Sequence, residues 1–211
     1  MMVPPVPAGH QIPPEPPDVA ARQLAVAARL LCGASTFFFL AFLFAYIYLR
    51  SLNQDGMWRP PHEHPNQAWG AVFIACIVLS ALTAIVSGRR MKAKSASWLP
   101  AVIGALVLAI VAVIAQCIEY TVQNFGPTDG AYASVFCAWS AFYLIAILFT
   151  MFWFETQIAT ELRARRSPAP ANEGDVKEPD RLIAPGLDAA VFLWTFMAGI
   201  GIVTYVTLYL A

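Results

Sequence analysis

Histidine and paired cysteine, the usual holders of redox metals, are nearly missing from the apolar parts of this sequence. Its three histidines all lie outside the long apolar stretches: His10, His62 and His64. Its four cysteines fall in four different stretches and form no C-x-x-C pair: Cys32, Cys76, Cys117 and Cys137. A haem or copper centre within a helical bundle needs histidine, methionine or cysteine ligands at depth. We therefore expect the chain to bind no metal and no redox cofactor itself, and the cysteines to act as small apolar packing residues.

Charge is also scarce. Only 12% of the residues are charged, 59% are hydrophobic, and the formal net charge is zero. A soluble domain carries about 25% charged residues, so this composition argues against one. The absence of net positive charge argues against nucleic acid as a partner. The start of the sequence lacks the pattern of a cleaved signal peptide, so we expect the first apolar stretch to act as the insertion signal.

What the sequence has instead is five long apolar stretches. They run over about 24–49, 67–88, 98–122, 131–156 and 187–210. Each is near or above the ~20 residues that a helix needs to cross a bilayer core. The pattern predicts an all-α integral membrane protein, with residues 24–211 forming one five-transmembrane-helix bundle. Residues 1–23 are rich in proline and predict an extended tail without a helix.

The positive charges predict how the bundle lies in the membrane. When the flanks of the stretches are assigned alternately to two sides, one side holds only Arg50 and Arg59. The other side holds eleven basic residues: Arg22, Arg29, Arg89, Arg90, Lys92, Lys94, Arg163, Arg165, Arg166, Lys177 and Arg181. Cytoplasmic segments carry the excess of lysine and arginine. The N-terminus is therefore expected in the cytoplasm and the C-terminus outside, on the periplasmic side.

Glu119 is the most informative polar residue, because an ionisable group within a membrane helix is a functional candidate. Gln116 lies one turn earlier on the same helix face. The position near a helix end favours a structural hydrogen bond or a contact with lipid head groups, and a role in proton handling is the alternative. Asp188 is expected at the start of the last helix, where a carboxylate stabilises the helix dipole. Between the last two helices, residues 163–186 are expected to form a flexible surface linker.

Three passages together resemble one known family, subunit III of the haem-copper respiratory oxidases in its short five-helix bacterial form. The first is FFFLAFLFAYIYLRSLNQDGMWRPP at 37–61, and the second is AQCIEYTVQ at 115–123 with GAYASVFCAWSAFYL at 130–144. The third is FLWTFMAGIGIVTYVTLYL at 192–210. The resemblance covers residues 24–211. The candidate structural and lipid-interacting residues at matching positions are Arg50, Gln116, Glu119, Tyr120, Tyr132 and Trp194, together with Ser134.

The chain also departs from that family. The family has a buried glutamate on the first of these helices, and Ser35 stands at that position. It has two histidines on the fourth helix and one on the last, and these positions are Tyr143, Ala146 and Thr195 here. The resemblance thus identifies a divergent member in which the ionisable interior of the family is replaced.

The resemblance implies an accessory, cofactor-free subunit of a terminal cytochrome c oxidase in the bacterial inner membrane. Such a chain has no active site of its own. It binds phospholipid and packs on subunit I, which carries haem and copper, beside subunit II and other respiratory-complex subunits. Two alternatives remain. One is a similar partner of a quinol oxidase or a nitric oxide reductase. The other, from a different class, is a small membrane transporter.

Overall fold

The computed structural model describes residues 16–53, 58–60, 64–95, 97–166 and 178–211, and every regular element within them is a helix. Five of these helices are long and apolar enough to cross a membrane: α1 (Pro17–Ser51), α2 (Gln67–Lys92), α3 (Trp98–Val122), α4 (Ala131–Arg166) and α5 (Glu178–Tyr205). A short π-helix, η1 (Val206–Leu210), continues α5. The all-helical, five-helix prediction is confirmed, and it is that of a multi-pass membrane protein. His10 and His62 lie outside the described residues.

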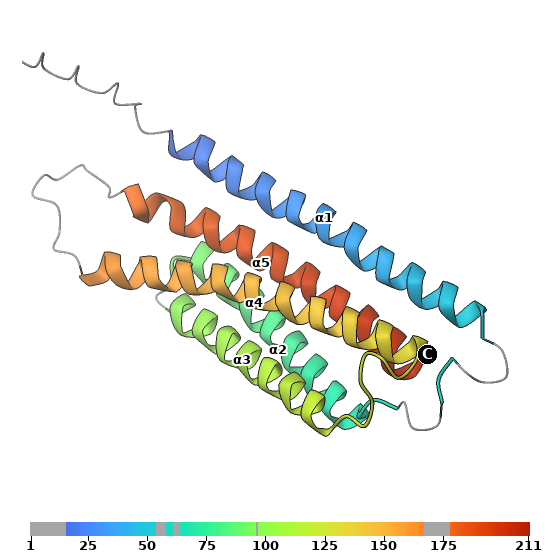
Figure 1. Ribbon diagram of the computed structural model, residues 1–211. Coiled ribbons are helices and arrows are strands. Elements are labelled where there is room, and N and C mark those ends of the chain that lie inside the picture. The colour runs from blue at the N-terminus through green and yellow to red at the C-terminus, as the bar shows by residue number, and fades with distance from the viewer. Residues whose placement is uncertain (1–15, 54–57, 61–63, 96, 167–177) are drawn as a thin grey trace, which may run out of the picture.

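α5 is the central helix of the bundle. It packs against α1, α2 and α4, whereas α3 packs mainly on α2 as its antiparallel neighbour. Figure 1 shows α1 along one edge, α2 and α3 along the other, and α5 between them. The end of α1, the start of α4 and η1 lie at the same end of the bundle (Figure 1). Aromatic side chains pack together there: Tyr46, Trp58, Phe125, Tyr132, Phe136 and Tyr209. We call this the aromatic end. The opposite end, which carries Arg89, Arg90 and Lys92 in the last turn of α2, is the basic end.

Four helices are longer than their apolar stretches predicted: α1, α2, which continues to Lys92, α4 and α5. α1 begins at Pro17 rather than near residue 24, so the expected tail boundary at residue 23 is wrong. Proline is well tolerated in the first helical turn, where its missing N–H has no intrahelical partner. α4 continues to Arg166 because its polar extension consists of good helix formers and contains an i, i+4 ion pair, Glu161 to Arg165, at 2.6 Å. Apolar runs mark the membrane core, and helices continue beyond it.

α5 also starts earlier than predicted, at Glu178, and takes up part of the expected 163–186 linker. Ile183 and Leu187 are buried, and Gln157 of α4 lies so close to Gly186 that a Cβ there would meet its side chain. This packing keeps the segment helical even though Pro185 lies within it. Asp188 therefore lies inside the helix, not at its start.

The expected dipole role of Asp188 is wrong for the same reason. Its carboxylate instead lies 3.0 Å from the ammonium group of Lys92 at the end of α2. Both side chains are substantially exposed, so this ion pair contributes little to stability in water, about 0–1 kcal/mol.

The turn between α2 and α3 has a defined helix-capping geometry. Lys94 adopts a left-handed conformation with φ of 53°. Its N–H donates to the carbonyl of Met91 at 2.9 Å, and the N–H of Ser95 donates to the carbonyl of Arg90 at 3.0 Å. These two bonds form a Schellman motif, which satisfies carbonyls that the end of a helix otherwise leaves unpaired. The short basic turn thus sets α2 and α3 as a hairpin.

Small residues allow the helices of this bundle to approach closely, as is common for helices in membranes. Gly201 of α5 faces α4 so closely that a Cβ on it would collide with the hydroxyl of Tyr143 and approach Ile74 of α2. That hydroxyl donates to the carbonyl of Met197 at 2.8 Å. Gly199, two residues away on α5, has open space where its Cβ would be.

Replacing the two glycines by alanine should therefore have opposite effects. We expect Gly201→Ala to lower the free energy of unfolding by about 1–3 kcal/mol, because the added methyl must push Tyr143 off α5. Gly199→Ala should leave stability unchanged or raise it by up to about 1 kcal/mol, because alanine favours the helix. Unfolding of the full chain in detergent measures both. Equal effects of the two substitutions would contradict the close approach at Gly201.

Candidate functional site

A buried polar cluster at the aromatic end is the candidate functional site. The carboxylate oxygen Oε2 of Glu119 accepts two hydrogen bonds, from Nε2 of Gln116 at 3.0 Å and from the hydroxyl of Tyr209 at 2.7 Å. The side chain of Glu119 is 0% exposed, and Gln116 and Tyr209 are buried too. Among the described residues, the second oxygen of Glu119, Oε1, has no partner.

The sequence reasoning placed Gln116 and Glu119 on one face of a helix, and the structure brings them together. Their spacing of three residues on α3 puts them one turn apart. The face that they share points into the bundle, so the carboxyl group is not at the surface. This burial argues against a head-group contact and agrees with a structural hydrogen bond, and proton handling stays the alternative prediction.

Tyr209 reaches Glu119 because two other helices hold η1 in place. Gln67 of α2 donates from Nε2 to the carbonyl of Tyr209 at 3.3 Å, and the hydroxyl of Tyr132 donates to the carbonyl of Leu208. The last carbonyls of a helix have no intrahelical partner, and these two side chains satisfy them. The ring of Tyr209 also lies directly over Gly70, where any Cβ would collide with it.

Tyr120 has a separate partner. Its hydroxyl donates to the hydroxyl oxygen of Ser140 on α4 at 2.9 Å, and that of Ser140 donates to the carbonyl of Phe136 at 2.6 Å. α3 packs much less on α4 than on α2. The bond from Tyr120 to Ser140 is therefore a specific link between α3 and α4.

Tyr132 lies at the centre of an aromatic cluster. Its ring packs edge-on against Trp58, at 5.8 Å between centroids, and Trp58 packs edge-on against Tyr46 of α1 at 5.2 Å. The guanidinium of Arg59 lies over the Tyr132 ring, 4.5 Å from its centroid. A cation at this distance from an aromatic face is attracted by it. The segment that follows α1 is thus held against the start of α4.

Trp194 is fully buried in a different place, deeper in the bundle. Its indole N–H donates to the hydroxyl oxygen of Ser80 on α2 at 3.0 Å, and Ser80 donates to the carbonyl of Ala105 on α3 at 2.6 Å. These two bonds connect α5, α2 and α3 in a chain. Phe154 of α4 packs edge-on against the Trp194 ring.

Arg50 does not join the buried cluster. It lies in the last turn of α1, where its guanidinium donates to the hydroxyl of Tyr46 at 3.4 Å and is exposed. A cation in that position interacts favourably with the negative end of the helix dipole.

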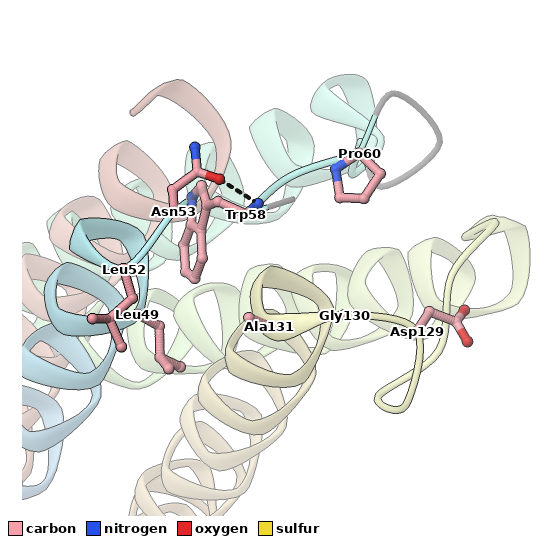
Figure 2. Close-up of a pocket in the computed structure, with 8 residues that line it drawn as sticks. All are labelled: Leu49, Leu52, Asn53, Trp58, Pro60, Asp129, Gly130 and Ala131. Carbon is pink, nitrogen blue, oxygen red and sulfur yellow. Dashed lines mark hydrogen bonds between the residues drawn. The ribbon is translucent and has the colours of Figure 1, made fainter. Parts of the chain in front are cut away.

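A pocket with a volume of about 500 Å³ lies beside these residues at the aromatic end. Figure 2 shows its wall: Leu49 and Leu52 at the end of α1, Asn53, Trp58, Pro60, and the 129–131 segment that leads into α4. The side-chain oxygen of Asn53 accepts from the backbone N–H of Trp58 at 2.8 Å, the bond drawn in Figure 2. Asp129 is turned away from the others in Figure 2, and its carboxylate accepts from the N–H of Gly126 at 2.7 Å.

Two further pockets lie along α1, where it meets α5 and α4. One pocket, of about 450 Å³, lies between α1 and α5 towards the basic end and includes Arg29, Asp188 and Phe192. The other, of about 240 Å³, lies deeper and is almost wholly apolar, with Ser35, Ala146 and Phe149 among its lining residues. Two of the departures from the resembling family, Ser35 and Ala146, thus face one groove. We call the two pockets together the α1 groove.

The remaining departures lie elsewhere. Tyr143 is buried, and its hydroxyl donates to a backbone carbonyl of α5. Thr195 is exposed and donates to the carbonyl of Val191 in its own helix. Within the described ranges, no three histidine, cysteine, aspartate or glutamate side chains come together as a possible metal site.

Several residues that build the site were missed by sequence reasoning. Tyr209, Ser80, Ser140 and Gly70 carry its hydrogen bonds or its close contacts, and none was singled out. The available signal was an isolated serine or glycine in an otherwise apolar helix, because such residues commonly mark a helix contact in a membrane. Tyr209 had no signal, because a tyrosine near a helix end is equally typical of a membrane interface.

Chemically, the arrangement joins helices. Gln116, Glu119 and Tyr209 are all buried, and the two bonds to Glu119 come from the preceding turn of α3 and from η1. No protein-family model matches the chain, and no curated protein matches it.

The role of Glu119 as a helix connector can be tested by substitution. Glu119→Ala leaves the Gln116 amide and the Tyr209 hydroxyl without an acceptor, and we expect it to lower the free energy of unfolding by about 3 kcal/mol. Glu119→Gln keeps the shape and one acceptor oxygen, so its cost should be smaller, about 1 kcal/mol. Unfolding of the full chain in detergent measures both changes.

Glu155 provides the matched control, because it is also a glutamate in a long helix but is exposed. Glu155→Ala should change stability by less than about 0.5 kcal/mol. If Glu119→Ala were as mild as this control, the cluster would not hold the helices together.

Proposed function

We propose that this chain is an accessory, cofactor-free subunit III of a bacterial terminal cytochrome c oxidase. In this proposal subunit I carries the haem and copper, reduces oxygen and pumps protons. Subunit II takes part in electron entry. The chain itself stabilises the catalytic subunit and binds lipid. It has no active site of its own.

The observation that carries the proposal is that all three resembling passages meet at the aromatic end. Trp58, from the first passage, packs on Tyr132, from the second. Tyr209, from the third, bonds to Glu119, also from the second. The three passages are far apart in the sequence but pack together at one place. Their shared location supports the resemblance more than any one passage does alone.

The surface of α1 supports a role in assembly. The helix exposes a row of large apolar side chains, including Phe37, Leu40, Phe44 and Ile47, and packs only along one side on α4 and α5. Such a row faces either lipid or another membrane helix. In this proposal it is part of the surface that the catalytic subunit covers.

Phospholipid binding is assigned to the α1 groove. Arg29 at its shallower part offers a cation for a phosphate group, and the deeper apolar part offers a place for an acyl chain. Basic side chains near the membrane surface attract anionic head groups by about 1 kcal/mol each. The groove passes the positions of Ser35 and Ala146, where small side chains leave room.

The proposed location is the bacterial inner membrane, with the basic end in the cytoplasm and the aromatic end outside. The support is the distribution of lysine and arginine, since α2 ends with Arg89, Arg90 and Lys92 and α4 with Arg163, Arg165 and Arg166.

The decisive experiment is purification of the tagged chain in mild detergent from the membrane of its natural host. We expect a large subunit to copurify and the reduced-minus-oxidised visible spectrum to show haem. The spectrum and the mass of the partners then distinguish a cytochrome c oxidase from a quinol oxidase or a nitric oxide reductase. A colourless preparation without partners would overturn the subunit proposal and direct attention to transport assays on the single chain.

The proposed orientation has its own test, by cysteine labelling in intact cells. In a variant whose four cysteines are replaced by alanine, Thr128→Cys places a thiol at the aromatic end and Ala93→Cys places one at the basic end; both positions are exposed. A membrane-impermeant maleimide should label only Thr128→Cys, and both variants should react after the cells are opened. The reverse pattern would invert the proposed topology.

A further inference from the structure

Thr204 differs from the other threonines that lie within the helices. A helical threonine commonly donates its hydroxyl to the carbonyl four residues earlier, which satisfies it locally. Five threonines do so here, at 2.7–2.9 Å: Thr36, Thr83, Thr150, Thr160 and Thr195. Thr204 is 5% exposed, and its hydroxyl has no hydrogen-bond partner among the described residues. A buried hydroxyl without a protein partner is unfavourable unless another polar group satisfies it.

A small cavity lies beside Thr204. Its volume is about 10 Å³, and its wall includes the polar side chains of Gln116, Ser140, Tyr143, Thr204 and Tyr209. A cavity needs at least about 10–15 Å³ to hold one water molecule, and the water needs two to four polar partners, so this cavity is at the lower limit of that size. An acyl chain or an organic ligand is too large for it.

The polar groups around the cavity retain hydrogen-bonding capacity. The hydroxyl of Tyr143 donates to the carbonyl of Met197, which leaves its oxygen free to accept. The hydroxyl of Ser140 donates to Phe136 and accepts from Tyr120, which leaves a second lone pair. Thr204 can both donate and accept. A water molecule offers two donors and two acceptors, so it complements this set.

We propose that this cavity is a binding site for one ordered water molecule, held by the hydroxyl of Thr204 together with polar groups of α3 and α4. Gln116 and Tyr209 belong to both the cavity wall and the Glu119 cluster. The water therefore extends that cluster to α5, so that α3, α4, α5 and η1 share one polar network. This site does not depend on the proposed oxidase function.

Substitution of Thr204 tests the site by the sign of its effect. Thr204→Val keeps the side-chain shape and removes the hydroxyl. If the hydroxyl holds a water, the variant should lower the melting temperature of the full chain, in detergent and with any copurifying subunits, by ~3 °C. If the cavity is empty, valine removes an unsatisfied polar group, and the melting temperature should stay the same or rise. That second result would overturn the proposal.

Two further variants serve as controls. Thr204→Ser keeps the hydroxyl and should lower the melting temperature less than Thr204→Val. Thr150→Val removes a buried hydroxyl that already bonds within its own helix, so its effect should be smaller than that of Thr204→Val. Equal losses for Thr150→Val and Thr204→Val would mean that threonine removal alone explains the effect, and would overturn the site.

A direct observation settles the matter independently of folding. A density map of the full assembly, at a resolution that shows ordered waters, should contain a peak within hydrogen-bonding distance of Oγ1 of Thr204. An empty cavity in such a map would overturn the proposal even if every variant folded poorly.

Discussion

The hydrogen bond from Tyr209 to Glu119 is the interaction on which the aromatic end depends. It joins η1 to α3 across ninety residues of sequence, between two buried side chains. The same short π-helix presents the carbonyls of Leu208 and Tyr209 to side chains of α4 and α2. Without η1 in this position, Glu119 and Tyr132 would each lose a partner in the buried interior, where an unpaired polar group is most unfavourable.

The polar side chains of the bundle fall into two groups with different consequences. Most threonines bond within their own helix and add nothing to the contacts between helices. Ser80, Ser140, Tyr143 and Trp194 instead bond to a neighbouring helix or to a residue that continues to one. In a membrane, where apolar side chains gain nothing by leaving lipid, such bonds and close packing at glycine hold helices together. The arrangement therefore suits a protein whose task is to hold a shape and present surfaces.

Much of the fold followed from hydropathy alone, because a helix that crosses a bilayer must have a minimum apolar length. The starts of α2 and α3 agree with the apolar runs. Asn66, a polar loop residue, caps the start of α2, and a tight basic turn precedes α3. The starts of α1 and α5 and the ends of α2 and α4 did not follow, because hydropathy reports the membrane core and not the polar turns beyond it. Asp188 shows the consequence: misplacing the start of α5 by nine residues assigned its carboxylate to a helix dipole instead of to Lys92.

The candidate site divides in the same way. The sequence by itself determined that Gln116 and Glu119 share a helix face and that Arg50 and Tyr132 lie near one end of the bundle, because these are consequences of helical periodicity and of crossing number. Only the tertiary structure decided that Glu119 faces inward to Tyr209, that Trp194 bonds to Ser80, and that the Thr204 hydroxyl opens on a cavity. Those outcomes depend on the rotation of each helix about its own axis. In lipid an all-apolar helix face does not determine that rotation. It is determined by close contacts such as those of Tyr209 with Gly70 and of Tyr143 with Gly201.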